Sequence, residues 1–278
     1  MGFDSSWDDA KEALGDLLAD LDALATTQDD FHATFVPFAD RVNLGTVRAA
    51  QWLSVAEPDH NEWGRRSNSD TNKGCLEPRE ESLDGNDFAL TDKAPSVLGF
   101  LPTAEGHYVS WFADSKNYFA CPESEVIGPT TDMSLIATAI DDIRLKGTGR
   151  LDIPMAWAHR LLSPNWSGLW DVTGYPSAYY ARRRVAILVA DMRTMAVHYE
   201  VPHRPNDSHN TPNWGHNKGT PQGFANIVET CNRMKAEGIE VHTIYVNGNS
   251  NGVQYMKDCA TSEEKHYHNV LDISDLRD

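Results

Sequence analysis

Apolar side chains repeat at helical spacing in three parts of the chain. In residues 6–25 the spacing i, i+3, i+4 builds one apolar stripe, which is typical of an amphipathic helix packed on a core. The same spacing predicts helices over residues 132–143 and 153–162. Apolar and polar residues alternate over 31–38, which predicts a short strand. A helix followed closely by a strand indicates a layered α/β fold.

The second half of the chain follows a strand–helix–strand order. Residues 184–191 form an almost continuous apolar run, which predicts a strand buried on both faces, as in a parallel sheet. Residues 221–237 predict a helix with proline at its start and Gly238 just past its end. A second buried strand is predicted over 239–246, followed by a helix near 253–259 and a strand around 268–271. This order predicts a Rossmann-like α/β fold with a doubly wound, mostly parallel sheet flanked by helices.

Residues 51–127 have a different character. They hold Trp52, Trp63 and Trp111 among many Gly, Pro, Asn and Asp residues, with little periodicity. Free linkers seldom carry so many aromatic residues. We therefore predict one α/β domain, formed by residues 1–50 and 128–278, with residues 51–127 as an irregular insertion.

Charge narrows the range of partners. The chain of 278 residues has 24 basic and 41 acidic side chains, a formal net charge of −17. Such a polyanion is repelled by nucleic-acid backbones and anionic lipids, so we expect no nucleic-acid partner. No apolar run reaches the roughly 18 residues of a membrane span, and no signal peptide opens the sequence.

The four cysteines form no CxxC pair and have no zinc-like spacing. Cys231 and Cys259 fall in the two helices predicted on either side of the 239–246 strand, where a bridge is geometrically possible. Cys75 and Cys121 bracket the insertion, where a disulfide would stabilise the fold most. Position alone leaves two interpretations open, namely two disulfides in an oxidising compartment or four reduced, buried cysteines in a cytosolic protein.

The residues supply no recognisable catalytic constellation. His159 lies among apolar neighbours on a predicted helix, which favours a semi-buried histidine with satisfied hydrogen bonds. Glycine-rich phosphate loops and nucleophile elbows are absent. A polar loop gathers several histidines whose spacing matches no metal-ligand pattern, so a solvated loop is favoured. These loop residues are His198, His203, Asp207, His209 and His216.

Motifs spread over almost the whole chain resemble those of one protein family. They are VPFADRVNLG at 36–45, GCLE at 74–77, PTTD at 129–132, AWAHRLLSP at 156–164, the strand at 184–191, the segment 231–260 and SDL at 274–276. In this order they resemble the TadG-like proteins of Tad (tight adherence) pilus assembly, whose extracytoplasmic part is a von Willebrand factor A-like (VWA) domain. The resemblance implies a VWA-like fold and the disulfides Cys75–Cys121 and Cys231–Cys259.

VWA domains often bind Mg²⁺ or Ca²⁺ through a metal-ion-dependent adhesion site made of oxygen ligands. That site uses an Asp-x-Ser-x-Ser motif, a loop threonine and an aspartate after a later strand. Asp191 stands where this last aspartate is expected, but Met192 replaces the glycine that follows it. Gly149 takes the threonine position, and Thr148 lies one residue early. The resemblance thus implies a degenerate cation site of Asp191 and Thr148, with no cofactor required.

The Asp-x-Ser-x-Ser motif itself is absent from the sequence. Residues 1–6 resemble the residues that follow this motif in the family, with Met1 in place of its methionine. We therefore expect a late-assigned start or a fragment, which lacks the first strand of the sheet and an upstream membrane anchor.

Three functions follow from these observations. We expect a non-enzymatic, periplasmic component of a Tad-type pilus system, tethered to the inner membrane in the full-length protein and contacting pilins or assembly proteins. The first alternative is a metal-ion-dependent adhesin with a working cation site. The second is a metal-dependent hydrolase that uses Asp191 with histidines of the loop.

Overall fold

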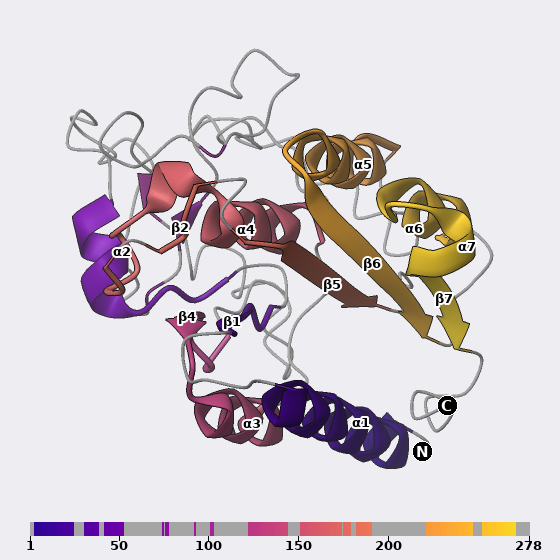
Figure 1. Ribbon diagram of the computed structural model, residues 1–278, viewed down its shortest axis with the longest axis horizontal. Helices are drawn as coiled ribbons and strands as arrows, with labels where there is room; N and C mark the ends of the chain where they lie inside the picture. Colours follow the sequence, from indigo (N-terminus) through magenta and orange to yellow (C-terminus); the bar gives the residue numbers. More distant parts are fainter. Residues whose placement is uncertain are drawn as a thin grey trace, which may run out of the picture.

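The computed structural model describes most of the predicted elements (Figure 1). The described residues are 3–24, 31–38, 42–52, 74, 76–77, 92, 101–102, 122–143, 151–173, 175–178, 182–190, 221–246 and 252–270. The elements are α1 (Phe3–Leu24), β1 (Ala33–Phe35), α2 (Thr46–Trp52), β2 (Leu76–Glu77), β3 (Leu101–Pro102), β4 (Ile127–Thr130), α3 (Met133–Asp142), α4 (Asp152–Leu162), the 3-10 turn η4 (Pro164–Trp166), β5 (Arg184–Ala190), α5 (Pro221–Ala236), β6 (Ile239–Val246), α6 (Val253–Cys259), α7 (Glu263–His266) and β7 (Tyr267–Val270).

The predicted helices and strands are confirmed with small shifts at their ends. Helices α1, α3, α4, α5 and α6 and strands β1, β5, β6 and β7 coincide with the ranges expected from the apolar pattern. The division into a domain and an insertion stays a prediction, because few of residues 51–127 are described. None of the described helices combines the length and the apolar character that crossing a bilayer requires.

A three-stranded parallel sheet carries the second half of the chain. Its order is β5-β6-β7, with Arg184 paired to Ile239 at one end and Val246 paired to Val270 at the other. Helix α5 links β5 to β6, and α6 with α7 links β6 to β7. Helices α4, α5 and α6 share one apolar core with the sheet, so they cover the same face of it (Figure 1).

The other face of strand β5 is open, which corrects the expectation that this strand is buried on both faces. Val185 and Ile187 are 39% and 45% exposed, whereas Ala186 and Leu188 between them lie in the core. Successive side chains of a strand point to opposite faces, so the alternation separates a covered from an open side. The apolar run in the sequence hides this difference, because valine and isoleucine occupy both sides.

A second apolar core lies on the far side of helix α4. Its centre is a cluster of four buried tryptophans, namely Trp52, Trp157, Trp166 and Trp170. The ring centroids of these tryptophans lie between 5.0 and 6.2 Å apart, in edge-on and stacked pairs. Helix α4 contributes Met155 to the sheet core and Trp157 to the tryptophan cluster, so it is buried on nearly every side.

Asn43 and Leu44 connect two of the motifs that carry the family resemblance, at 36–45 and 74–77, to Pro122. The side-chain Oδ1 of Asn43 accepts from the Gly45 amide at 2.9 Å, and its Nδ2 donates to the Pro122 carbonyl at 2.8 Å. The neighbouring Leu44 amide donates to the Gly74 carbonyl at 2.8 Å. Gly74 has φ +87°, and a Cβ there would lie 2.2 Å from Asn43 Oδ1, so only glycine fits. The motif residues therefore have a packing role.

Candidate functional site

The cation site predicted from the resemblance lies outside the described residues. The structure describes β5 to its last residue, Ala190, but neither Asp191 nor Thr148. The histidines of the polar loop, like Cys75 and Cys121, are also outside the described part. All of these assignments stay predictions.

The disulfide Cys231–Cys259 is confirmed. It joins α5 to α6 with the two Cα atoms 5.1 Å apart, and the sheet core encloses both cysteines. This core also holds Ile227, Met234 and Met256 from the same two helices. The bridge therefore closes the helical layer over strand β6, and the interpretation with four reduced cysteines is wrong for this pair.

His159 is more deeply buried than the sequence predicts, and its hydrogen bonds are only partly satisfied, because Nδ1 has no partner among the described residues. It connects two helices. Its Nε2 lies 2.7 Å from Oε2 of Glu237, which directly follows α5. The histidine side chain is 1% exposed, whereas that of Glu237 is 27% exposed. The pair ties α4 to the end of α5 and so has a structural role.

Asp92 fixes the turn after α4. Its Oδ2 accepts hydrogen bonds from the Ser163 hydroxyl and, at 2.7 Å, from Asn165 Nδ2. Its backbone carbonyl accepts from Trp166 Nε1 at 2.7 Å. Burial raises the pKa of Asp92, but the Ser163 hydrogen bond, the charge of His159 and the Asn165 hydrogen bond outweigh it, so the pKa lies below its ordinary value of 3.8.

This lowered pKa predicts a pH dependence of stability. A carboxylate whose pKa is lower in the folded than in the unfolded protein stabilises the fold above its ordinary pKa, and this contribution disappears as the pH falls through the folded value. We expect Asp92→Asn to melt at a lower temperature than the wild type at neutral pH, with the gap narrowing below pH 3.8. Thermal melts across this range measure it. An equal gap at every pH would contradict the assignment, and Asp171→Asn, an exposed aspartate, serves as control.

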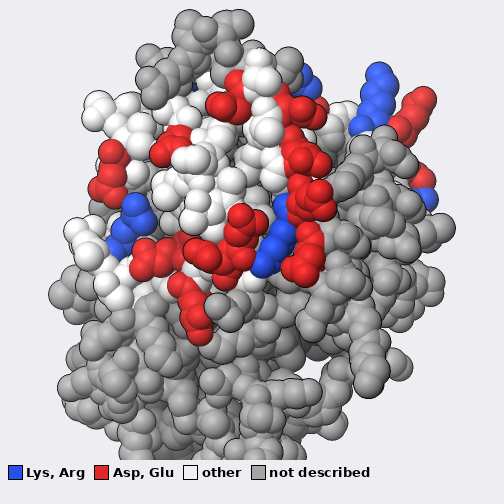
Figure 2. All heavy atoms as spheres, turned by 90° about the horizontal axis from the view of Figure 1, so that it is seen from below, with Lys and Arg blue, Asp and Glu red and all other residues white. Residues whose placement is uncertain are grey.

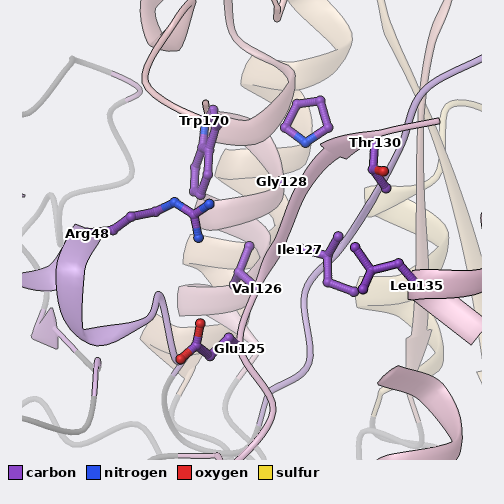
Figure 3. Close-up of a pocket in the computed structure, with 9 residues that line it drawn as sticks. Arg48, Glu125, Val126, Ile127, Gly128, Thr130, Leu135 and Trp170 are labelled. Carbon is purple, nitrogen blue, oxygen red and sulfur yellow. The ribbon is translucent and has the colours of Figure 1, made fainter. Parts of the chain in front are cut away.

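A groove with a volume of about 290 Å³ lies beside the tryptophan cluster (Figure 3). Arg48 points across it toward Trp170, with its Cζ 5.6 Å from the ring centroid, and its Nη2 lies 3.0 Å from Oδ2 of Asp171. Gly128 forms part of the wall, and a Cβ there would meet Trp170 at 3.3 Å. The guanidinium is thus engaged by the protein itself, and the groove presents no converging set of polar groups among its described lining residues.

Acidic side chains gather over helices α1 and α3, which pack against each other at the opposite end of the molecule from α5 (Figures 1 and 2). Along α1 they recur every four residues on the outer face. Where the exposure of these helices is described, the exposed acidic residues are Asp8, Glu12, Asp16, Asp20, Asp22, Asp141 and Asp142. We call this surface the acidic band; its charge favours a basic partner.

Three side chains converge on the open side of the sheet. Glu240 and His242 project from β6 on the same side as Val185 and Ile187, to which they are paired in the sheet. His242 Nε2 lies 2.8 Å from Glu240 Oε1, and His266 Nε2, from the end of α7, lies 3.3 Å from the same oxygen. All three side chains are 15–27% exposed, so the group remains open to solvent. We call Glu240, His242 and His266 the histidine–glutamate cluster.

Arg183 stabilises the ionised form of Glu240 in this cluster. Its Nη2 donates to both carboxylate oxygens of Glu240, at 2.9 Å to Oε1 and 2.7 Å to Oε2. This hydrogen bonding, together with that of His242, lowers the pKa of Glu240 to about 2. The glutamate is therefore ionised at neutral pH and can serve as an anionic ligand.

Among metal ligands the sequence suggests the histidines of the polar loop first, but it also contains a signal for this cluster. Glu240-x-His242 has the two-residue spacing that places side chains on one face of a strand, and His266 directly precedes the next strand, β7. Strands β6 and β7 are parallel neighbours, with Ile244 paired to His268. Tyr267 pairs with Thr243, so His266 arrives beside His242 at the start of this pairing.

Known proteins give little guidance. No protein-family model matches the chain, and no curated protein is similar enough to count as a relative. Among solved structures, proximal thread matrix protein 1 from the mussel byssus is 17% identical, with 54% of this chain and 31% of that chain covered and a TM-score of 0.33. For a second crystal form of the same protein the identity is 16%, the match covers 55% of this chain and 31% of that chain, and the TM-score is 0.34. The match spans about a third of those chains, and at these values it assigns neither fold nor function.

Proposed function

We propose that the chain is a non-enzymatic, extracytoplasmic binding module of a Tad-type pilus assembly system, with a VWA-like, doubly wound arrangement. The observation that carries the proposal is the disulfide Cys231–Cys259. The resemblance to TadG-like proteins implies this pairing, and disulfides of this kind persist in oxidising compartments such as the periplasm. In the full-length protein an upstream anchor would hold the domain at the inner membrane.

The contacts of Asn43 support the same proposal. The residues on the chain next to Cys75 and Cys121, namely Gly74 and Pro122, both bond to the segment of Asn43 and Leu44. Motifs that are far apart in the sequence thus pack together, as expected of a shared structural framework. The predicted Cys75–Cys121 disulfide would reinforce this framework.

The contact surface we assign to a pilin or assembly protein is the acidic band on α1 and α3 (Figure 2). Complementary charge steers association and selects partners. Because this chain has a formal net charge of −17, the partners it attracts are those with basic surfaces. The module needs no catalytic group for such a role. Any Mg²⁺ or Ca²⁺ at Asp191 and Thr148 would belong to the alternative function, a metal-ion-dependent adhesin.

Gene deletion and complementation test this proposal. We expect deletion of the coding sequence to abolish surface pili, counted by electron microscopy, and the wild-type gene to restore them. Unchanged pilus numbers in the deletion strain would refute the function. Acid quenching of intact cells followed by alkylation under denaturing conditions should find Cys231 and Cys259 protected as a disulfide, whereas free thiols at these positions would refute the location.

Charge reversal tests the contact surface separately. Asp8→Lys, Asp20→Lys and Asp22→Lys together should restore several-fold fewer pili than the wild type, because they neutralise the acidic band. A matched control makes the same change in charge on the other helices, with Glu229→Lys, Asp258→Lys and Glu264→Lys, which are also exposed. Equal complementation by both variants would show that the band is not the contact surface.

A further inference from the structure

Two imidazole nitrogens and a carboxylate oxygen of the histidine–glutamate cluster face one another. The ligand atoms of Glu240, His242 and His266 all lie within 4.8 Å of one another. Mixed nitrogen and oxygen donors suit Zn²⁺ and related transition metals, whereas Mg²⁺ and Ca²⁺ prefer oxygen donors alone. The donor set therefore indicates a different chemistry from that of the oxygen site predicted at Asp191.

The spacing of the donor atoms suits a tetrahedral ion. Ligands about 2.0–2.1 Å from a tetrahedral zinc ion lie about 3.3 Å from one another. Glu240 Oε1 lies 2.8 Å from His242 Nε2 and 3.3 Å from His266 Nε2. The two histidine nitrogens lie within 4.8 Å of each other, so rotation of the two imidazole rings toward Glu240 would bring the three atoms to the spacing that the ion requires.

A second layer of contacts orients the cluster. His266 Nδ1 lies 2.7 Å from the Ser262 hydroxyl. When Nδ1 donates to this hydroxyl, Nε2 presents its lone pair toward the Glu240 carboxylate, an arrangement that needs a proton or a metal ion between them. Arg183 Nη2 donates to both carboxylate oxygens of Glu240, at 2.7 Å to Oε2 and 2.9 Å to Oε1, so an ion at Oε1 would leave this contact on Oε2.

The backbone keeps the two sides of the cluster in register. Thr261 bonds Val241 of β6 twice, through its hydroxyl at 2.8 Å and its amide at 2.9 Å. Ser262 follows directly, so the start of α7 is fixed to the strand that carries Glu240 and His242. Sites built on regular elements hold their ligands more precisely than sites on loops.

We propose that Glu240, His242 and His266 bind a divalent transition-metal ion of the zinc class, with a fourth position open to solvent. Three protein ligands and an accessible fourth position are the arrangement of zinc sites that also take a water molecule or an external ligand. The ion would join β6 to α7 on the open side of the sheet, beside Val185 and Ile187. The proposal is independent of pilus assembly.

Titration of the metal-free full chain with ZnCl₂ by calorimetry, and with CoCl₂ by visible absorption, tests the site. We expect the cluster to bind one zinc ion and to give the intense absorption of tetrahedral Co²⁺. Ser262→Ala removes an outer contact and should weaken binding by about 10-fold. His242→Gln with His266→Gln should weaken it by more than the roughly 100-fold that loss of an outer contact can cause. MgCl₂ and CaCl₂ should not compete.

The matched control is His203→Gln with His209→Gln, which removes two histidines of the polar loop. It should keep wild-type affinity. Loss of zinc binding in this control, unchanged affinity in the cluster variant, or no zinc uptake by the wild type would each overturn the proposal. Glu240→Gln, which keeps the shape of the side chain, gives an independent test should the double histidine variant not fold, and unchanged affinity there would also overturn it.

Discussion

Replacing Trp166 by alanine should lower the free energy of unfolding by about 4 kcal/mol, the middle of the range for truncating a buried tryptophan. Trp166 is fully buried, with ring centroids 5.1 Å from Trp52, 5.6 Å from Trp157 and 5.8 Å from Trp170. Alanine would leave a cavity among three large rings that cannot close around it. It would also remove the hydrogen bond from Nε1 to the Asp92 carbonyl.

Urea denaturation of the two proteins measures this loss. Val47→Ala is a suitable control, because Val47 is 68% exposed on α2 and its truncation should change stability by less than about 0.5 kcal/mol. Trp166→Phe keeps an aromatic ring, so its free energy of unfolding should lie between those of Trp166→Ala and Val47→Ala. A Trp166→Ala protein as stable as the control would mean that the tryptophan cluster is not the centre of the second apolar core.

Replacing Cys231 and Cys259 by alanine together should cost about 3.5 kcal/mol, because the bridge closes a loop with a sequence separation of 28 residues in the unfolded chain. Alanine is chosen because both positions lie in the apolar core, where serine would bury an unpaired hydroxyl. The stability lost therefore reflects the missing link between α5 and α6.

Denaturation under non-reducing conditions compares the double variant with the wild type. The single variant Cys259→Ala should lose at least as much stability, since it also leaves Cys231 without its partner. A double variant within about 1 kcal/mol of the wild type would contradict a stabilising bridge. It would also weaken the case for an oxidising compartment, which rests on this disulfide.

The helices and strands were largely predictable, because the apolar residues within each helix recur at helical spacing and those of each strand form an alternating or continuous apolar run. Strand β6 was predicted at its observed bounds, because the residues from Ile239 to Val246 are mostly β-branched or apolar and Gly238 ends the preceding helix. Burial of β5 was less predictable. Val185 and Ile187 are as apolar as the residues that face the core, so composition does not reveal which side is covered.

The candidate site depended on contacts between distant residues, which one sequence shows poorly. The Cys231–Cys259 pairing was available from the resemblance, and the Glu240-x-His242 spacing was visible in the sequence. What the spacing could not supply was the parallel register of β6 with β7, on which the approach of His266 to Glu240 depends. Asp191 and Thr148 remain predictions on the strength of the resemblance.

Helix α4 has a consequence for how the molecule loses its structure. Met155 anchors it in the sheet core, and Trp157 and Leu161 anchor it in the tryptophan cluster. Neither core can release this helix without opening the other. The two halves of the described fold are therefore coupled in one cooperative unit, in which damage to either half is transmitted to the other through a single helix.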